Sequence, residues 1–290
     1  MNKQDKLYII LINYNSYNYT VDCVKSLKNS TIQNFRIIIL DNNSGDNSGK
    51  QLADKYSDDP IVDIILSKEN TGFAGGNNYA IKQALCQGAD SILLLNNDTE
   101  VKENFLDTLL SGWNKDTVRT PRINYFDDKT TVWYANGKFS KLMVITYNRY
   151  PHKNSFVNFA SGCCMLLSKD IIEKVGFFDE KFFMYYEDVD YCLRMKNAGI
   201  KIEYIANAVI YHKCGRSSGG ERSVLSIYYA NRNRFYIIKK YKFGFFCWIY
   251  TLATRIIRII AAPVNGNKDL IILDAWRDFR KGFMGKNPKC

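Results

Sequence analysis

The first third of the chain alternates short apolar runs with segments of helical periodicity. The apolar runs cover residues 7–12, 37–40, 61–66 and 91–95. Runs of this length, rich in isoleucine and leucine and largely without polar alternation, are typical of parallel strands buried on both faces. Between them, residues 20–27 and 76–86 carry apolar side chains at helical spacing. This order predicts an α/β, Rossmann-like fold with a mostly parallel central sheet flanked by helices.

A short polar loop follows each of the predicted strands. The loops contain Asn13-Tyr14-Asn15, Asp41-Asn42-Asn43-Ser44, Asn70-Thr71-Gly72-Phe73 and Asn96-Asn97-Asp98. In an open parallel sheet the carboxyl ends of the strands meet at one edge, where ligands bind. Turn preferences explain any one such loop. Several of them at one edge predict a binding crevice.

Composition narrows the class of protein. The chain has 290 residues, of which 46% are hydrophobic and 24% charged, so it is globular rather than disordered. Its net charge of +11 favours an anionic partner such as a nucleic acid, a sugar nucleotide or an anionic membrane face, unless the protein is simply basic. The eight cysteines form no C-x-x-C pair, so a zinc cluster is not expected. Without a signal peptide, we expect reduced thiols and a cytoplasmic enzyme.

Acidic and aromatic residues are gathered between Phe182 and Arg194. Glu187, Asp188 and Asp190 lie there at the start of a predicted helix. An acid in this position can simply cap the helix, but three acids within four residues repel one another. Carboxylates in apolar surroundings cost free energy unless they are paired, bound to metal or used in chemistry. All three are therefore candidate general bases, able to take the proton of an attacking hydroxyl.

Two further residues are candidate metal or phosphate ligands. Asp98 follows the predicted strand 91–95, and a hard cation such as Mg²⁺ or Mn²⁺ takes one or two protein oxygens together with phosphate oxygens. Alternatively, Asp98 caps a helix that follows it. His212 ends a predicted strand and precedes a loop rich in glycine and serine, residues 213–220, where an imidazole could bind metal or phosphate. Taken alone, His212 is better explained as a structural histidine.

The second half of the chain shows a different pattern. Strands are predicted at 156–167, with an interruption at Ser161-Gly162, and at 201–206 and 209–212; helices are predicted from Ser168 to Gly176 and from 188 or 189 to 198. Residues 243–262 are apolar but carry Arg255 and Arg258 on one helix face. Each arginine would cost about 2.5–3.5 kcal/mol at the centre of a bilayer. We therefore favour an interfacial helix whose arginines reach the headgroups over a helix packed on its own domain, and both over a spanning helix.

Several motifs occur in order along residues 7–240. They are Ile12-Asn-Tyr-Asn-Ser16, Leu40-Asp-Asn-Asn-Ser44, Asn70-Thr-Gly-Phe-Ala-Gly-Gly-Asn-Asn78, Leu94-Leu-Asn-Asn-Asp-Thr99, Ala160-Ser-Gly-Cys-Cys164, Gly176-Phe-Phe-Asp-Glu180, Phe183-Met-Tyr-Tyr-Glu-Asp-Val-Asp190, His212 and Asn231-Arg-Asn-Arg234. The ordered set resembles the bacterial family-2 inverting glycosyltransferases with the GT-A fold, in their rhamnosyltransferase-like branch. The resemblance implies a GT-A catalytic domain over 1–220, with a nucleotide-sugar-binding half (1–120) and an acceptor and catalytic half (121–220). Residues 221–290 would form an amphipathic, membrane-associating helical extension.

The resemblance also implies roles for single residues. Asp188 would be the general base, with Glu187 beside it in the E-D motif. Asp98 would hold Mg²⁺ or Mn²⁺ with His212 as a further ligand; only the last position of the D-x-D-type motif is acidic here, so a weak metal site is expected. The remaining residues would hold the nucleoside and shape the donor crevice: Asn13, Tyr14, Asn15, Asp41, Asn70, Gly72, Asn97, and Gly75 and Asn77 of the Gly75-Gly76-Asn77-Asn78 turn.

The implied reaction transfers a sugar with inversion from a nucleotide donor to a hydroxyl. The donor would be dTDP-L-rhamnose, or alternatively a UDP-hexose or UDP-N-acetylhexosamine. The acceptor would be a glycan on polyprenyl diphosphate, extended at the cytoplasmic face of the membrane in the synthesis of O-antigen, capsule or cell wall. Residues 125–155, which match the family least, would shape the acceptor pocket. No nucleic-acid partner is expected, and the oligomeric state is open.

Two other classes of protein fit less well. A nucleotidyltransferase would carry a glycine-rich loop with arginine and lysine after the first strand, where this chain has Asn-Tyr-Asn-Ser-Tyr-Asn. A non-catalytic protein that binds nucleic acid or anionic lipid would interleave basic and aromatic residues on one face. It would leave the cluster of acids after Phe182 unexplained.

Overall fold

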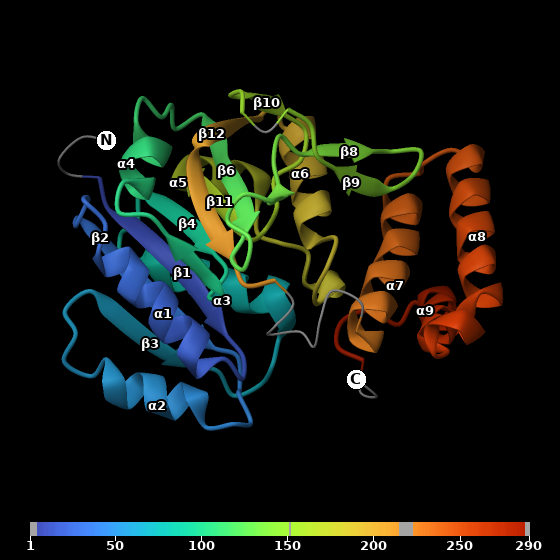
Figure 1. The fold of residues 1–290 in the computed structure, drawn as a ribbon, viewed down its shortest axis with the longest axis horizontal. Helices are drawn as coiled ribbons and strands as arrows, with labels where there is room; N and C mark the ends of the chain where they lie inside the picture. Colours follow the sequence, from blue (N-terminus) through green and yellow to red (C-terminus); the bar gives the residue numbers. More distant parts are fainter. Residues whose placement is uncertain (1–4, 151, 215–222, 288–290) are drawn as a thin grey trace.

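The computed structural model describes residues 5–150, 152–214 and 223–287 (Figure 1). The first part alternates strands and helices as predicted. Its elements are β1 (Leu7–Asn13), α1 (Tyr17–Lys28), β2 (Phe35–Asp41), α2 (Ser48–Lys55), β3 (Val62–Leu66), α3 (Gly72–Cys86) and β4 (Ser91–Leu95). Strands β1 to β4 pair in parallel in the order β4-β1-β2-β3. Every residue of β4 is buried, which is why its sequence is continuously apolar.

The second part extends the same sheet beyond β4. It comprises β5 (Thr99–Val101), α4 (Phe105–Leu110), β6 (Thr117–Tyr125), β7 (Val132–Tyr134), β8 (Lys138–Ser140), β9 (Ile145–Tyr147), β10 (Ser155–Val157), β11 (Cys164–Ser168), α5 (Lys169–Val175), α6 (Glu187–Asn197) and β12 (Lys201–His212). The order is β10-β12-β6-β11-β4, with β6 and β12 parallel and β11 antiparallel to β4. Helices flank the sheet (Figure 1), and the predicted α/β architecture is confirmed.

Two strand predictions need adjustment, and one cap is confirmed. Residues 201–206 and 209–212 belong to one strand, β12, whose register with β6 shifts between Ile205 and Val209. The strand predicted at 156–167 is divided into β10 and β11. Ser168 does cap α5, since its hydroxyl accepts a hydrogen bond from the Ile171 amide at 3.2 Å. Strand pairing partners, which lie far along the chain, decide where these strands begin and end.

The predicted glycine turn at 75–78 is wrong, because these residues lie inside helix α3. Gly75 is buried, and a Cβ at this position would lie 2.7 Å from Cβ of Thr71. Asn77 is also buried and donates from its side-chain amide to the carbonyl of Phe73 at 2.8 Å. Small residues are therefore needed in the first turns of α3 for close packing rather than for chain reversal.

The C-terminal part is helical and lies beside the sheet domain at the right of Figure 1. It contains α7 (Val224–Lys240), α8 (Phe245–Ile260) and α9 (Ile271–Arg280), with 3-10 turns at Ala262–Asn265 and Lys268–Leu270. Aromatic side chains join the three helices: the Phe235 ring packs against those of Trp276, Phe279 and Trp248, with centroids 4.8, 5.6 and 6.2 Å apart. In the described chain, no helix has both the length and the apolar character needed to cross a bilayer.

The expectation that Arg255 and Arg258 reach outward to lipid headgroups is wrong. Arg255 is buried, and its Nε donates to Oδ1 of Asn231 on α7 at 2.8 Å. Arg258 forms an ion pair with Asp269. Both side chains turn inward because the neighbouring segments provide polar partners that the sequence pattern of α8 alone does not reveal.

Candidate active site

A cavity of about 680 Å³ lies where the β4–β5 loop meets β12, the start of α6 and the β9 strand. Asp98, His212, Glu187 and Asp188 all line it. Two carboxylate sites that are about ninety residues apart in the chain therefore share one space. Aromatic rings and one arginine complete much of the wall: Phe73, Trp133, Tyr134, Tyr147, Phe159, Tyr185, Tyr186 and Arg234.

The segment leading into α6 has an unusual backbone. Phe183, Tyr185 and Tyr186 have φ values of 62°, 65° and 73°. Aromatic residues rarely adopt positive φ, and each such residue costs on the order of 1–3 kcal/mol. The turn places Glu187 and Asp188 at the first positions of α6, at the edge of the cavity. Strain of this kind persists only where the surrounding structure holds it.

Helix α7 holds this strained turn. The side-chain amide nitrogen of Asn233 lies 2.8–2.9 Å from the carbonyl oxygens of Phe182, Met184 and Tyr185. Arg232 adds a hydrogen bond from Nη2 to the Phe182 carbonyl at 3.2 Å. Both Asn233 and Arg232 are fully buried. The C-terminal helices thus support the segment that carries the candidate base.

Asp188 is partly buried and accepts backbone hydrogen bonds at both oxygens. Its Oδ2 accepts from the Gly162 amide at 3.2 Å and its Oδ1 from the Val189 amide at 2.8 Å. Burial raises the pKa of Asp188 to about 6, and the backbone hydrogen bonds partly offset this effect. A carboxylate with a pKa near 6 is ionised at neutral pH and is a stronger base than an ordinary aspartate.

Glu187 is more deeply buried than Asp188. Its Oε2 has no hydrogen-bond partner among the described residues. Burial, and then the charge of Asp188, raise the pKa of Glu187 well above its usual range. The raised pKa favours the neutral form of Glu187, which can donate a hydrogen bond.

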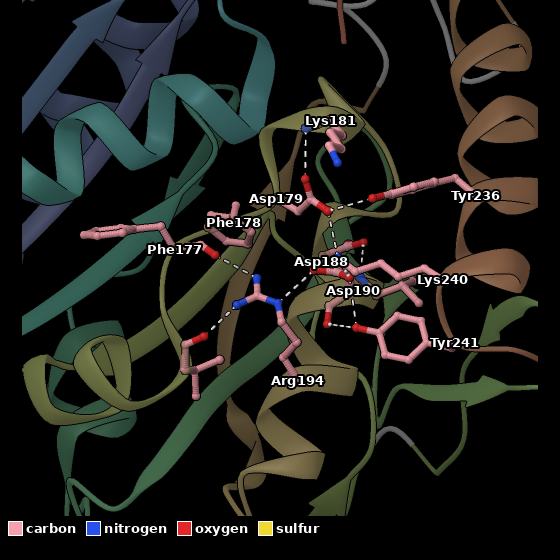
Figure 2. Close-up of polar contacts among 12 residues, drawn as sticks. Phe177, Phe178, Asp179, Lys181, Asp188, Asp190, Arg194, Tyr236, Lys240 and Tyr241 are labelled. Carbon is pink, nitrogen blue, oxygen red and sulfur yellow. Dashed lines mark hydrogen bonds and ion pairs between the residues drawn. The ribbon is translucent and has the colours of Figure 1, made fainter. Parts of the chain in front are cut away.

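Asp190, the third candidate base, does not line the cavity. Figure 2 shows it between Arg194, Lys240 and Tyr241. Its carboxylate lies 2.9 Å from Nε of Arg194 and 2.6 Å from Nζ of Lys240, and it accepts from the Tyr241 hydroxyl at 2.9 Å. Asp190 is fully buried, so these partners explain why a charge is tolerated there. Its role is to fasten α6 to the end of α7.

Asp98 and His212 contact each other at the cavity wall. Nε2 of His212 lies 3.0 Å from Oδ1 of Asp98. Strand β5 follows Asp98 and pairs Thr99 with His212, so the alternative that Asp98 caps a helix is wrong. The His212 ring also packs edge-on against Trp133. Burial lowers the pKa of His212, but the charge and hydrogen bond of Asp98, together with Cys214, outweigh it and raise the pKa to about 10.

These two residues are the candidate metal ligands. The described chain contains no group of three or more His, Cys, Asp or Glu side chains arranged to hold an ion. Asp98 and His212 fit a cation that takes most of its ligands from a diphosphate and water, as Mg²⁺ does, rather than one held in a protein cage. His212 must lose its proton to coordinate. Residues 215–220 of the loop predicted beside it lie outside the described residues.

The predicted donor-binding residues lie beside the cavity rather than in its wall. Asn13 is fully buried: its side-chain amide nitrogen donates to Oδ1 of Asp41 at 2.7 Å and to Oγ of Ser48 at 2.9 Å. Oδ1 of Asn13 accepts from the Thr20 hydroxyl. The Asn97 side-chain amide also donates to that hydroxyl. Asn13 and Asn97 therefore orient neighbouring loops rather than presenting polar atoms to a ligand.

The loops at the ends of β1 and β2 are also connected to each other. Oδ1 of Asn15 accepts from the backbone amide of Gly45 at 2.9 Å, and the backbone amide of Asn15 donates to Oγ of Ser44 at the same distance. Tyr14 projects from this pair of loops and is 42% exposed. Its ring is therefore available to pack against a flat ligand.

Asn42, which the sequence did not single out, connects the loop after β2 to the start of α3. Its amide donates to Oδ1 of Asn70 at 3.1 Å and to the Gly72 carbonyl at 2.9 Å. Gly72 has a φ of 75°, and a Cβ there would lie 2.3 Å from the carbonyl oxygen of Phe183. Only glycine allows this approach. A polar residue directly after a predicted strand was the available signal for Asn42.

Comparison with known proteins decides the family. A family model described as Glycosyl transferase family 2 matches residues 8–176. The chain belongs to glycosyl transferase family 2. It is therefore a transferase enzyme, and its fold is the GT-A fold predicted from the motifs.

Curated relatives cover most of this family-2 chain. The dTDP-rhamnosyl transferase RfbF of Shigella flexneri is 27% identical over 248 residues, which span 81% of this chain and 80% of that protein. The low-salt glycan biosynthesis hexosyltransferase Agl10 of Haloferax volcanii is 29% identical over 80% of this chain and 75% of that protein. The N-acetylglucosaminyl-diphospho-decaprenol L-rhamnosyltransferase of Mycobacterium tuberculosis is 24% identical over 74% and 78%.

Solved structures agree on the fold. The mannosyltransferase PcManGT from Pyrobaculum calidifontis, in complex with GDP-Man and Mn²⁺, matches with a TM-score of 0.63 at 9% identity, covering 96% of this chain and 88% of that one. GalNAc-T7 with UDP, GalNAc and Mn²⁺ matches with a TM-score of 0.67 at 13% identity, over 80% of this chain and 48% of that one. At such identities the likeness carries the fold alone.

Proposed function

We propose that this glycosyltransferase inverts the anomeric centre of a nucleotide-linked sugar as it moves the sugar to a hydroxyl of a lipid-linked glycan. The observation that carries the proposal is the common cavity. Asp98 and His212, which contact each other, line it together with Glu187 and Asp188. Direct displacement needs one charged site for the leaving diphosphate and one base for the incoming hydroxyl.

Asp188 acts as the general base. Its pKa of about 6 leaves it ionised at neutral pH, and its backbone hydrogen bonds fix its orientation. It takes the proton of the acceptor hydroxyl as that oxygen forms a bond to the anomeric carbon and the bond from that carbon to the diphosphate breaks. Glu187, neutral in its buried position, donates a hydrogen bond to the bound sugar.

Asp98 and His212 hold Mg²⁺ or Mn²⁺. The fit rests on their contact at the cavity wall and on the need for a divalent ion to take further ligands from phosphate. When bound, the ion supplies positive charge against the leaving nucleoside diphosphate. Two of the structural neighbours were solved with Mn²⁺, which supports an ion of this class.

The donor-side loops bind the nucleotide. Tyr14 and Asn15 meet the nucleoside, while Asn13, Asp41, Asn70 and Asn97 keep the loops in place through their hydrogen bonds. The names of two relatives support L-rhamnose from dTDP-L-rhamnose as the donor sugar. A third relative is named a hexosyltransferase, so a UDP-linked hexose or N-acetylhexosamine is the alternative.

The acceptor is a glycan on polyprenyl diphosphate, and the reaction takes place at the cytoplasmic membrane face with the enzyme peripherally bound. Flat rings around the cavity, among them Trp133 and Tyr147, suit the apolar faces of sugars. Arg234 lines the same wall, and its Nε donates to the Tyr186 hydroxyl at 2.6 Å. The name of the mycobacterial relative supports this class of acceptor.

A donor panel tests the proposal. dTDP-L-rhamnose, UDP-glucose and UDP-N-acetylglucosamine are each added to the enzyme with and without Mn²⁺, and thermal unfolding is followed. A ligand that binds only the folded state raises Tm by mass action, and we expect the largest rise with dTDP-L-rhamnose plus Mn²⁺. Asp98→Asn and His212→Gln should remove the Mn²⁺-dependent part. A larger rise with a UDP-sugar would favour the alternative donor, and no rise with any of the three would contradict nucleotide-sugar binding.

A further inference from the structure

Helix α8 exposes an apolar side and buries a side that contains polar residues. Its buried residues, Cys247, Thr251 and Arg255, form one stripe at four-residue spacing. A surface helix normally turns its apolar stripe toward the core. The outward side of α8 is instead apolar, with side chains exposed by 46% to 76%: Phe245, Phe246, Ile249, Ile256, Ile257 and Ile260. We call these six side chains the apolar face of α8.

Exposed apolar residues continue beyond this helix. Val264 follows the end of α8, and Leu273 projects from α9, with 89% and 53% exposure. Leu142, in the turn between β8 and β9, is also exposed. Figure 1 shows that this turn reaches toward the start of α8. Exposed apolar side chains gathered on one helix and its neighbours are typical of a contact with a partner or a membrane.

A groove of about 510 Å³ lies between the β8–β9 turn, the end of α6 and the start of α8. Lys141, Lys196 and Lys242 line it, together with apolar residues that include Leu142 and Phe246. No aspartate or glutamate is among its lining residues, and none of the three lysines forms an ion pair with a carboxylate in the described part of the chain. We call it the lysine groove.

We propose that the apolar face of α8 and the lysine groove together dock this protein on a membrane of anionic phospholipid. The apolar face enters the boundary between headgroups and acyl chains, and the lysine groove receives a headgroup phosphate. Positive charge at the rim of an exposed apolar helix complements an anionic bilayer surface. A second copy of the chain is a poorer occupant, because its three lysines would add like charge. The net charge of +11 strengthens the same preference.

The docking surface lies next to the candidate active site. Strand β9 pairs with β8, and the β9 residues Ile145 and Tyr147 line the cavity that holds Asp188. The β8–β9 hairpin therefore has the lysine groove near its turn and the cavity along its second strand. A membrane at the groove would bring lipid-linked molecules to the mouth of the cavity. Docking itself does not depend on the proposed sugar transfer.

Vesicle co-sedimentation tests this surface on the full chain. Vesicles of phosphatidylcholine alone are compared with vesicles that also contain phosphatidylglycerol, at low and at high salt. We expect binding to the anionic vesicles that weakens as salt screens the lysines. Replacing Lys141, Lys196 and Lys242 together by Gln should weaken that binding on the order of a hundredfold, at roughly fivefold per lysine. Phe246→Ser with Ile257→Ser should weaken binding to either vesicle.

The matched control neutralises three exposed lysines that do not line the groove, in α1, in α2 and after β3: Lys25, Lys50 and Lys68. It removes the same charge and should change binding by only a few-fold. Tm of each variant shows that it is folded. If the control variant lost as much vesicle binding as the groove variant, net charge alone would explain the effect. That result would overturn the proposed role of the lysine groove. The wild type could instead fail to bind anionic vesicles and form concentration-dependent dimers that Phe246→Ser abolishes. This result would assign the apolar face of α8 to a second copy of the chain and overturn the proposal. Neither result would alter the test of sugar transfer.

Discussion

At the scale of single residues, two adjacent acids have different surroundings. Glu187 is buried with an oxygen that makes no hydrogen bond in the described chain, while Asp188 accepts two backbone hydrogen bonds. This difference supports the proposal that Asp188 is the base and that Glu187 donates a hydrogen bond. Their neighbour Asp190 has three polar partners and serves the structure alone.

The first prediction concerns pH. A general base must be ionised, and burial raises the pKa of Asp188 to about 6. We expect kcat/KM to fall about tenfold per pH unit below about pH 6 and to level off above it. The measurement is the pH profile of initial rates under low donor concentration, with the folded fraction checked at each pH. A flat profile down to about pH 4 would assign the base to another group.

The second prediction concerns stability. The folded-state pKa values of Glu187 and Asp188 are raised above their unfolded values, so the folded protein binds more protons and stability falls as pH rises through that window. Asp188→Asn should raise the free energy of unfolding by about 1–3 kcal/mol at pH ~8 and change it little at pH ~4. Glu187→Gln should raise it at pH ~8 as well. Urea titrations at both pH values measure this. Asp190→Asn is the matched control and should destabilise instead, because it leaves Arg194 and Lys240 without their buried partner. Stabilisation by all three substitutions would contradict this division.

At the scale of elements, α7 and the turn before α6 form one unit. The third prediction is that Asn233→Ala lowers the free energy of unfolding by about 1–3 kcal/mol, because the Met184 and Tyr185 carbonyls lose the Asn233 donor and the Phe182 carbonyl keeps only Arg232. The released turn should also misplace Asp188, so that kcat falls while donor affinity changes little. Urea unfolding and steady-state kinetics measure the two effects. The control is Asn197→Ala, at an exposed position on the last turn of α6. A stable Asn233→Ala variant with normal kcat would contradict the role of α7.

The helices and strands also show which features of the fold and the site could be predicted from the sequence. The apolar runs and polar loops of β1 to β4 were predictable because local periodicity encodes them. The carboxylates at 98, 187 and 188 were found because acids among apolar residues are conspicuous. Asn233 and Arg234 were quoted only as part of a motif, since their contacts lie about fifty residues away in the chain. The inward turn of Arg255 was missed for the same reason: its partner, Asn231, lies on another helix.

At the scale of the whole molecule, the C-terminal helices are continuous with the catalytic part. Ala230 and Arg234 of α7 line the cavity although they lie beyond the predicted boundary at residue 220, which itself falls outside the described residues. The ring of Phe235, only 1% exposed, is covered by side chains of α8 and α9. The division into domains therefore stays a prediction, and α7 cannot be assigned to an independent extension on these contacts.

The fourth prediction follows from that packing. Deleting residues 243–290 would expose Phe235, so we expect a lower Tm and loss of sugar transfer as well as loss of membrane binding. Phe235→Ala alone should cost about 3–5 kcal/mol of the free energy of unfolding. Thermal unfolding of the deletion and of Phe235→Ala checks this. The surface variant Ile257→Ser, on the outward side of α8, is the control and should leave Tm within a few degrees. A deletion variant with unchanged Tm and transfer would show that the C-terminal part is separable.

Asp188, in the cavity it shares with Asp98, is proposed to take the proton from the acceptor hydroxyl. Single-turnover transfer by the wild type and by Asp188→Asn tests this, with donor affinity measured on the same preparations by calorimetry. We expect the substitution to slow transfer by roughly 10²–10⁴-fold and to leave the donor Kd within a few-fold. Transfer by Asp188→Asn at the wild-type rate would contradict it.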